Sequence, residues 1–270
     1  MAAPPNISSN YTEVMPGVYE LVPNDEYHSS EGISKTNVCD IYESIAQYQM
    51  HKAYPQKPTD PMIKGSAFHD LVLLPNEYHK NYFVCSTKGK ATKVYKQAVL
   101  DHPHQTVITT GMADDIHYMR DALYDNPAIK EVLESKTILR EVSLWVKDPL
   151  TGLLLKIRPD IIVDGVIYDL KSTIAPHSRA FLHSVYKYSY HVQSAFYQDC
   201  AALNGMMMSN FVFLVVGSKP PHLTAIYDIN EDLMEEARDK YREALNRYAE
   251  YLASPDGWSG LSYGRETVTL

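Results

Sequence analysis

The chain has 270 residues, of which 45% are hydrophobic and 21% charged, as in one large soluble globular domain. No apolar run approaches the roughly 18 residues of a membrane span, and residues 1–10 lack the basic and apolar regions of a signal peptide. Three widely spaced cysteines argue against a disulfide framework and a four-cysteine iron–sulfur cluster, so we expect a cytoplasmic protein with reduced thiols.

Helical signals dominate the first half of the chain. Ser34 is suited to cap a helix of about twenty residues, which two prolines end. Apolar periodicity predicts further helices over residues 62–74, 109–125 and 128–135. We expect residues 1–15 to be a flexible lead-in and residues 16–270 to form a single domain.

The second half alternates between strands and helices. Residues 139–147 alternate as a strand does, residues 211–216 are entirely apolar, and residues 223–229 form another strand. Long helices are expected over residues 177–204 and 231–253. This order predicts an α/β fold with a central mixed β-sheet flanked by helices.

The most informative stretch is a predicted hairpin of residues 153–163 and 166–171, joined at Asp164-Gly165. Because side chains alternate along a strand, Asp169 and Lys171 point to one face, and Asp160 lies opposite Asp169. Carboxylates that converge in an apolar setting repel each other unless a cation lies between them, and Mg²⁺ is the simplest such cation. The alternative is an exposed hairpin with solvated charges.

Other polar residues have both a functional and an ordinary interpretation. His69 lies one helical turn after Gly65, where it is either a metal or phosphate contact or a structural histidine. Glu141 is either a third acidic neighbour of the metal or a solvated charge. Gln193 and Tyr197, one turn apart, either line the site or form a polar pair.

The charge distribution bears on nucleic-acid binding. A net charge of −8 speaks against it, since such proteins normally carry a basic surface. Residues 86–96, however, contain four lysines and no acid, whereas residues 228–239 are strongly acidic. We therefore expect a separate basic face, which includes Lys88 and Lys90. Ser172 and Thr173, which follow Lys171 directly, either bind a phosphate or simply begin a loop.

Pro159-Asp160 followed by Asp169-Leu170-Lys171 resembles the motif of the PD-(D/E)xK nuclease superfamily. Together with Gly65-x-x-x-His69 and Gln193-x-x-x-Tyr197, the order resembles the exonuclease branch of that superfamily. The stretches at residues 27–36 and 64–78 are similar to the nuclease domain of exodeoxyribonuclease VIII, including its phage- and prophage-encoded versions. The resemblance spans roughly residues 17–250.

The resemblance implies a restriction-endonuclease-like core and a set of site residues. Asp160, Asp169, His69 and Glu141 would surround Mg²⁺, with Mn²⁺ as a possible substitute. Lys171 would orient the attacking water and stabilise phosphate charge, while Gln193 and Tyr197 line the site. Separately, from their charge and position, we expect Arg158, Ser172, Thr173, Lys88 and Lys90 to contact DNA.

The resemblance also implies an activity and partners. Relatives degrade one strand of duplex DNA from the 5′ end and leave a 3′ overhang for a single-strand annealing recombinase. They form rings of three or four subunits. A ring with a basic lumen and an acidic exterior would reconcile DNA binding with the net charge of −8. The alternatives are a structure- or site-specific endonuclease and a DNA-binding scaffold without catalysis.

Overall fold

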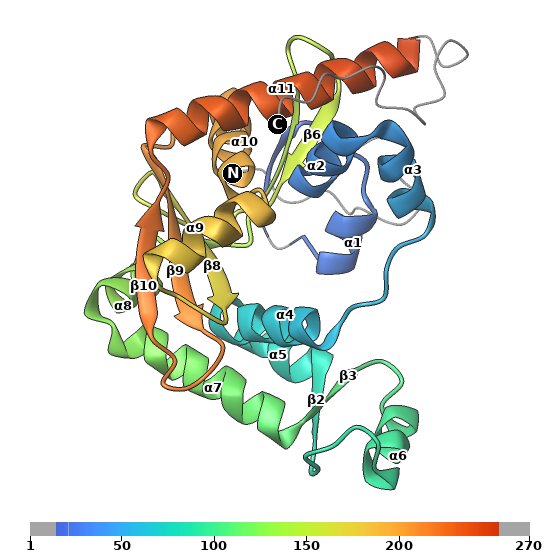
Figure 1. The fold of residues 1–270 in the computed structure, drawn as a ribbon, viewed down its shortest axis with the longest axis vertical. Helices are drawn as coiled ribbons and strands as arrows, with labels where there is room; N and C mark the ends of the chain where they lie inside the picture. The colour runs from blue at the N-terminus through green and yellow to red at the C-terminus, as the bar shows by residue number, and fades with distance from the viewer. Residues whose placement is uncertain (1–14, 21, 254–270) are drawn as a thin grey trace, which may run out of the picture.

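A computed structural model describes residues 15–20 and 22–253 (Figure 1). Its central sheet has five strands in the order β10-β9-β8-β7-β4. The strands β8 and β9 are parallel, whereas the other neighbouring pairs are antiparallel, so the sheet is mixed as predicted. The bounds are β4 Leu139–Arg140, β7 Ile161–Val163, β8 Val166–Thr173, β9 Asn210–Gly217 and β10 Thr224–Asp228.

Two smaller sheets accompany the central one. The first has the order β1-β5-β6 and is antiparallel, and the second pairs β2 with β3 in parallel. Their strands are β1 Gly17–Tyr19, β5 Ser143–Lys147, β6 Leu154–Ile157, β2 Tyr82–Cys85 and β3 Thr106–Thr109. The β2–β3 pair and α6 form an extension at the lower right of Figure 1.

Eleven helices lie in the described part of the chain. One apolar cluster joins α4, α7 and α8 to one face of the central sheet, and a second joins α9 to the opposite face. A third packs α2, α10 and α11 on β5 and β6. The bounds are α1 Asn24–Ser29, α2 Lys35–Glu43, α3 Ile45–Ala53, α4 Asp60–Leu73, α5 Pro75–Asn81, α6 Lys93–Asp101, α7 Thr110–Asp125, α8 Pro127–Leu133, α9 Ser178–Lys187, α10 Tyr190–Leu203 and α11 Glu231–Ala253.

The predicted hairpin is present and turns at Asp164-Gly165. Both residues have positive φ, 47° and 78°, as the tight two-residue turn of a twisted hairpin requires. The register pairs Val163 with Val166 and Ile161 with Tyr168, so Asp160 follows in line opposite Asp169. The sequence pattern therefore located the turn and the facing carboxylates.

Two predicted strands are each broken into two pieces. Residues 153–163 divide into β6 and β7 around Arg158-Pro159-Asp160, and residues 139–147 divide into β4 and β5 around Glu141. Glu141 has a φ of 51°, a left-handed conformation that ends a strand. Its N–H donates to the backbone oxygen of Asp160 (3.1 Å), which ties the two breaks together. The prediction of continuous strands was wrong because both strands cross from one sheet to another here.

Two predicted helices are also interrupted. Ser34 caps α2 as expected, but Ser44 ends that helix and caps α3. Ser189, with a φ of 52°, separates α9 from α10 within the expected helix of residues 177–204. Pro75 does end α4, but it also stands in the first turn of α5, where proline is well tolerated.

Within the described residues no helix is long and apolar enough to cross a bilayer. The N-terminal lead-in predicted for residues 1–15 lies outside the described residues except for Met15.

Candidate active site

The strand β8 carries Asp169 and Lys171 on the same face. The side chain of Asp169 is buried, and its Oδ2 lies 2.5 Å from Nζ of Lys171. Leu170 points the other way into the apolar cluster under α4 and α7. The alternation of β8 thus buries a leucine while it directs an acid and a base toward α10.

Asp160 reaches the same place from the end of the neighbouring strand. Its Oδ2 accepts a hydrogen bond from the backbone N–H of Leu170 (2.8 Å) and lies 3.3 Å from Nδ1 of His69. His69 comes from α4, which packs against the opposite face of the sheet, the one that carries Leu170. A helix and two strands therefore converge on one carboxylate.

His69, Glu141 and Asp160 each offer one ligand atom, and these atoms lie within 4.8 Å of one another. Carboxylate oxygens and an imidazole nitrogen suit Mg²⁺ or Mn²⁺, with waters in the remaining positions. Asp169 adjoins this group, and its buried Oδ2 is ion-paired with Lys171. The donor set of His69, Glu141 and Asp160 fits a divalent cation, which would also neutralise the carboxylates.

The raised pKa values of two of these carboxyl groups also fit a site for a cation. Burial, reinforced by the charge of Asp169, raises the pKa of Asp160 to about 6. Burial, reinforced by Asp160, raises the pKa of Glu141 to about 8. Protein cations do not compensate these acids fully, so each holds its proton more tightly than a solvated carboxyl does. Burial disfavours the charged form of Lys171, yet Asp169 and Asp160 outweigh it and raise the pKa of Lys171.

Helix α10 contacts Asp169 through the side chain of Gln193. Nε2 of Gln193 donates a hydrogen bond to Oδ1 of Asp169 (2.5 Å), and both side chains are buried. Tyr197, one turn later, packs against Phe211 of β9. Burial raises the pKa of the Tyr197 phenol well above its usual range, so Tyr197 stays neutral. Of this predicted pair, Gln193 contacts an acid of the site directly.

The structure places Arg158 differently from the prediction. Its guanidinium is buried over the ring of Tyr27 (4.0 Å) and donates to Ser143 Oγ (2.8 Å) and the backbone oxygen of Val22 (3.0 Å). Nε lies 3.9 Å from Oε2 of Glu141. A DNA contact does not fit this placement, because the donors already serve the protein. Through these contacts Arg158 instead binds the segment before α2, and it lies close to the carboxylate of Glu141.

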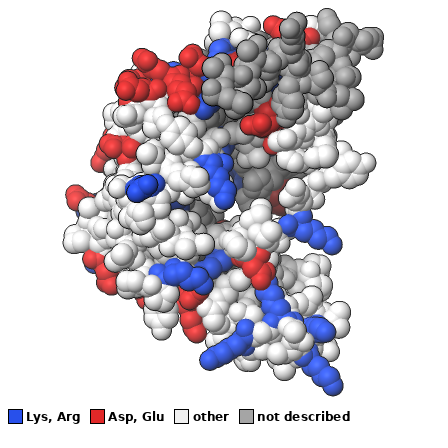
Figure 2. Space-filling view, viewed as in Figure 1, with Lys and Arg blue, Asp and Glu red and all other residues white. Residues whose placement is uncertain are grey.

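The predicted lysine contacts lie away from the carboxylates. Lys88 and Lys90 belong to the extension formed by β2, β3 and α6, where Figure 2 shows blue side chains around the lower right of the molecule. Lys88 is exposed, whereas Nζ of Lys90 pairs with Asp60 (2.5 Å). The structure therefore does not bring them to the acidic cluster within one chain.

Ser172 and Thr173 end β8 and lie beside the cluster. Oγ of Ser172 would be 4.0 Å from a Cβ added to Gly65, so α4 and the end of β8 approach each other here. Oγ1 of Thr173 accepts from the backbone N–H of Ala175 (3.4 Å), which favours the loop-starting interpretation for this residue.

Two neighbours of the site were not predicted as functional. The ring of Tyr190 lies 4.8 Å from Nζ of Lys171, and Nζ of Lys35 donates to the backbone oxygen of Tyr188. Tyr190 stands three residues before Gln193, so helical spacing alone would have placed both on one face. Lys35 belongs to the stretch of residues 27–36 that carries the family resemblance, but no spacing pattern connects its side chain with the carboxylates.

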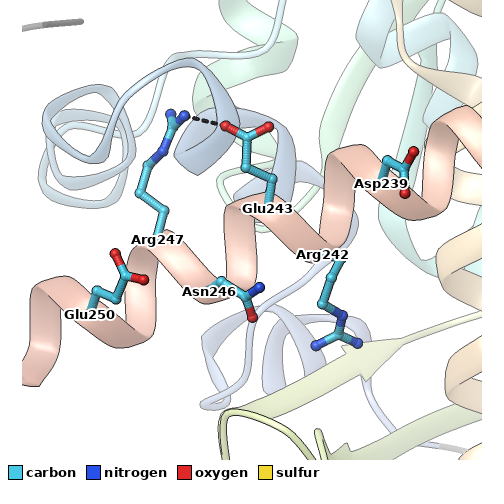
Figure 3. A pocket seen from close by; sticks show the side chains of 6 residues that line it. All are labelled: Asp239, Arg242, Glu243, Asn246, Arg247 and Glu250. Carbon is cyan, nitrogen blue, oxygen red and sulfur yellow. Dashed lines mark hydrogen bonds and ion pairs between the residues drawn. The ribbon is translucent and has the colours of Figure 1, made fainter.

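A polar groove elsewhere is unrelated to these residues. Figure 3 shows side chains of α11 that line it, and all six come from that one helix: Asp239, Arg242, Glu243, Asn246, Arg247 and Glu250. None of the predicted site residues lies in it.

The sequence model of one protein family, the PDDEXK-like domain of unknown function (DUF3799), matches residues 34–256. The chain belongs to this family. The match covers most of this PDDEXK-like chain, including His69, Asp160, Asp169 and Lys171. No curated protein matches it.

Two solved structures are similar to this chain at low sequence identity, and one of them has a TM-score above 0.5. A "Putative exonuclease" from Eubacterium rectale is 13% identical with a TM-score of 0.61, over 92% of this chain and 96% of that one. A "phage related exonuclease" from Haemophilus somnus 129PT is 12% identical with a TM-score of 0.35, over 84% and 97%. The first likeness agrees with the PDDEXK-like fold, and the chain is a nuclease-like protein of that fold.

Proposed function

We propose that this chain is a Mg²⁺-dependent double-strand DNA exonuclease that works from the 5′ end and leaves 3′ single-stranded overhangs for phage-type recombination. The observation that carries the proposal is the meeting of His69, Glu141 and Asp160 within 4.8 Å, beside the Asp169–Lys171 pair. Mn²⁺ is expected to substitute for Mg²⁺, because it accepts the same oxygen and imidazole ligands.

Each residue has a physical task in phosphodiester hydrolysis. Asp160, Asp169, Glu141 and His69 would hold the cation, which lowers the pKa of a bound water and neutralises phosphate charge. Lys171 keeps its proton beside Asp169 and places a positive charge where charge develops on the phosphate. Gln193 fixes Asp169 through its hydrogen bond, so the carboxylate faces the scissile phosphate in one orientation.

The exonuclease activity is favoured over the two other functions that the sequence leaves open. The Eubacterium rectale protein of similar fold carries an exonuclease name, in agreement with the sequence resemblance. An endonuclease would cut closed-circular duplex, and an inactive scaffold would cut nothing. Asp160, Asp169 and Lys171 are all present, which speaks against the scaffold.

The partners are part of the proposal. We expect duplex DNA ends as substrate, a single-strand annealing recombinase as the protein partner, and a homo-oligomeric ring of three or four subunits. A ring would gather the lysines of α6 and its preceding loop around the duplex, which would offset the net charge of −8. Light scattering of the full chain tests the assembly, and a monomer that degrades DNA processively contradicts it.

The activity is tested with linear and closed-circular duplexes in Mg²⁺, with EDTA as the control. We expect nucleotides from linear DNA alone and none in EDTA. A 5′ label released before a 3′ label establishes the direction. Asp160→Asn and Asp169→Asn should lower the rate at least about a thousandfold, or roughly 4 kcal/mol of barrier. Near-normal activity in either folded variant contradicts the assignment.

A further inference from the structure

The outer face of α9 has an unusual composition for a solvent-exposed helix. Phe181 and Val185 bury the inner face against the central sheet. Positions three and four residues apart form the outer face, which carries Arg179, Leu182, His183, Tyr186 and Lys187. We call these residues, together with Tyr188 just after the helix, the α9 stripe. It combines cations, an imidazole and apolar or aromatic groups, and it contains no acid.

The absence of acids extends well beyond the helix. No aspartate or glutamate occurs between Asp169 and Asp199, although the chain has 33 acidic residues and 25 basic ones. Arg179 and Lys187 are exposed, and neither forms an ion pair with any described residue. Blue atoms lie among white ones over α9 in Figure 2, whereas red atoms gather along α11. The stripe therefore presents uncompensated positive charge.

Two tyrosines of the stripe are half-exposed, and the backbone of Tyr188 is anchored. Tyr186 is 49% and Tyr188 50% exposed, and Nζ of Lys187 lies 5.2 Å over the Tyr188 ring. The backbone oxygen of Tyr188 accepts from Nζ of Lys35, and Ser189 follows in a left-handed conformation. Fixed backbone lowers the entropy lost when a ligand stacks on these rings.

The stripe is continuous with the carboxylate cluster. The rings of Tyr188 and Tyr190 lie 5.6 Å apart, and the Tyr190 ring lies 4.8 Å from Nζ of Lys171. A path from Lys171 over Tyr190 thus reaches Tyr188 and then continues along α9, whose ten residues extend about 15 Å. A strand of nucleic acid at the cluster could therefore continue along the stripe without leaving the positive surface.

We propose that the α9 stripe binds the uncut DNA strand as a single strand while its complement is degraded. Positive charge interleaved with exposed aromatic rings is the surface that single-stranded nucleic acid needs, because unpaired bases stack on the rings while cations contact phosphates. Duplex DNA keeps its bases stacked inside and gains little from such rings. The proposal rests on the proposed exonuclease function: the cut strand leaves as nucleotides, so only its complement persists as a long single strand.

Binding of a fluorescein-labelled oligothymidylate to the full chain in EDTA, followed by anisotropy, tests the proposal without cleavage. The double variant Tyr186→Ala/Tyr188→Ala should bind at least about tenfold more weakly, because stacking on each ring contributes to affinity. Tyr54→Ala is the matched control, since Tyr54 is 76% exposed at the end of α3, and it should bind normally.

The cations have a separate readout in the salt dependence of binding. Arg179→Ala/Lys187→Ala should reduce the slope of log affinity against log salt by about 0.7 for each phosphate of the single strand that these side chains neutralise. Lys147→Ala, an exposed lysine of β5, should leave the slope unchanged. An affinity equal to that of the unaltered protein in the tyrosine variant overturns the proposal. A changed oligomeric state with unchanged DNA affinity also overturns it, because the stripe then binds a second copy.

Photocrosslinking covers the case in which the double variant fails to fold. An oligonucleotide that carries iododeoxyuridine should crosslink to Tyr186 or Tyr188 of the unaltered protein, and crosslinks only elsewhere overturn the proposal. The two proposals fail separately. A protein that binds single strands through the stripe but releases no nucleotides contradicts the exonuclease function alone. An active exonuclease whose affinity for single strands does not depend on the stripe contradicts this inference alone.

Discussion

Gln193 and Asp169 are joined inside the protein by a hydrogen bond of 2.5 Å from the amide Nε2 to the carboxylate Oδ1. The bond comes from α10, so that helix sets the orientation of an acid on β8. Oδ2 of the same carboxylate faces Lys171. Because the amide has no charge, it holds the carboxylate without competing with a cation for its negative charge.

Gln193→Ala should lower the rate of DNA degradation about 10- to 100-fold, as is typical when a partner that orients a metal ligand is removed. The variant should also need more Mg²⁺ for half-maximal rate, because Asp169 loses its fixed orientation. Titration of activity against Mg²⁺ measures both effects. The melting temperature serves as control, and a variant with normal Mg²⁺ dependence would show that Gln193 is only a packing residue.

The facing carboxylates could be predicted from the sequence because the hairpin depends on local chemistry. Asp164-Gly165 favours a turn with two positive φ angles, and alternation then fixes which residues of β8 share a face. The cap at Ser34 is local in the same way. These features need no knowledge of the rest of the chain.

The breaks at Glu141 and Ser189 could not be predicted, because neither glutamate nor serine is a residue type that favours a left-handed backbone. Residues 139–147 alternate cleanly, yet the chain crosses between two sheets at Glu141. The burial of Arg158 was missed for a related reason: its partners Val22, Tyr27 and Ser143 are distant in sequence or belong to another strand. Long-range packing decided these positions.

His69→Ala should lower activity at least tenfold, since Nδ1 of His69 lies 3.3 Å from Oδ2 of Asp160 within the cluster. The side chain is partly exposed, so the variant should lose little stability. Thermal melting in EDTA measures stability, and nucleotide release measures activity. A lower melting temperature with normal activity would instead identify a structural histidine.

The raised pKa values of Glu141 and Asp160, about 8 and about 6, predict an inverted pH dependence of stability. In the unfolded chain these carboxyls titrate near 4, so between pH 4 and 8 the folded protein binds more protons than the unfolded one. Stability of the metal-free protein should therefore fall as the pH rises across this window. Melting in EDTA at pH 6 and pH 8 measures the effect.

Mg²⁺ supplies the control for this pH dependence. Ionised carboxylates bind the cation, so Mg²⁺ should raise the melting temperature more at pH 8 than at pH 6. Glu141→Gln removes one of the titrating groups and should flatten the dependence in EDTA. An unaltered slope in that variant would mean that other groups cause it.

Arg242→Ala should destabilise the fold through Asp148, which is buried in the turn before β6. Nη1 of Arg242 lies 2.9 Å from Oδ2 of Asp148, and Thr151 donates to the same oxygen. These hydrogen bonds outweigh the effect of burial and lower the pKa of Asp148. Without Arg242 the buried carboxylate loses its cation, at a cost of about 3 kcal/mol.

Urea unfolding measures this loss, with Arg120→Ala as the control because Arg120 of α7 pairs with the exposed Asp121. A lowered pKa stabilises the folded state above the pKa of the unfolded acid, and that stability disappears as the pH falls. The difference between the unaltered protein and Arg242→Ala should accordingly shrink in acid. An equal effect of both substitutions would contradict a special role for Asp148.

Gly65→Ala should separate stability from activity. Gly65 lies inside α4, and an added Cβ would meet no atom closer than Oγ of Ser172 at 4.0 Å. Alanine favours a helix over glycine by about 1 kcal/mol, so the melting temperature should rise. If DNA approaches this turn of α4 closely on its way to His69, the same methyl group obstructs it and the rate should fall.

Gly111→Ala in α7 is the control, because its Cβ would meet nothing within 4 Å and it too should stabilise the fold. Normal activity in a stabilised Gly65→Ala protein would show that the substrate does not pass over this turn of α4.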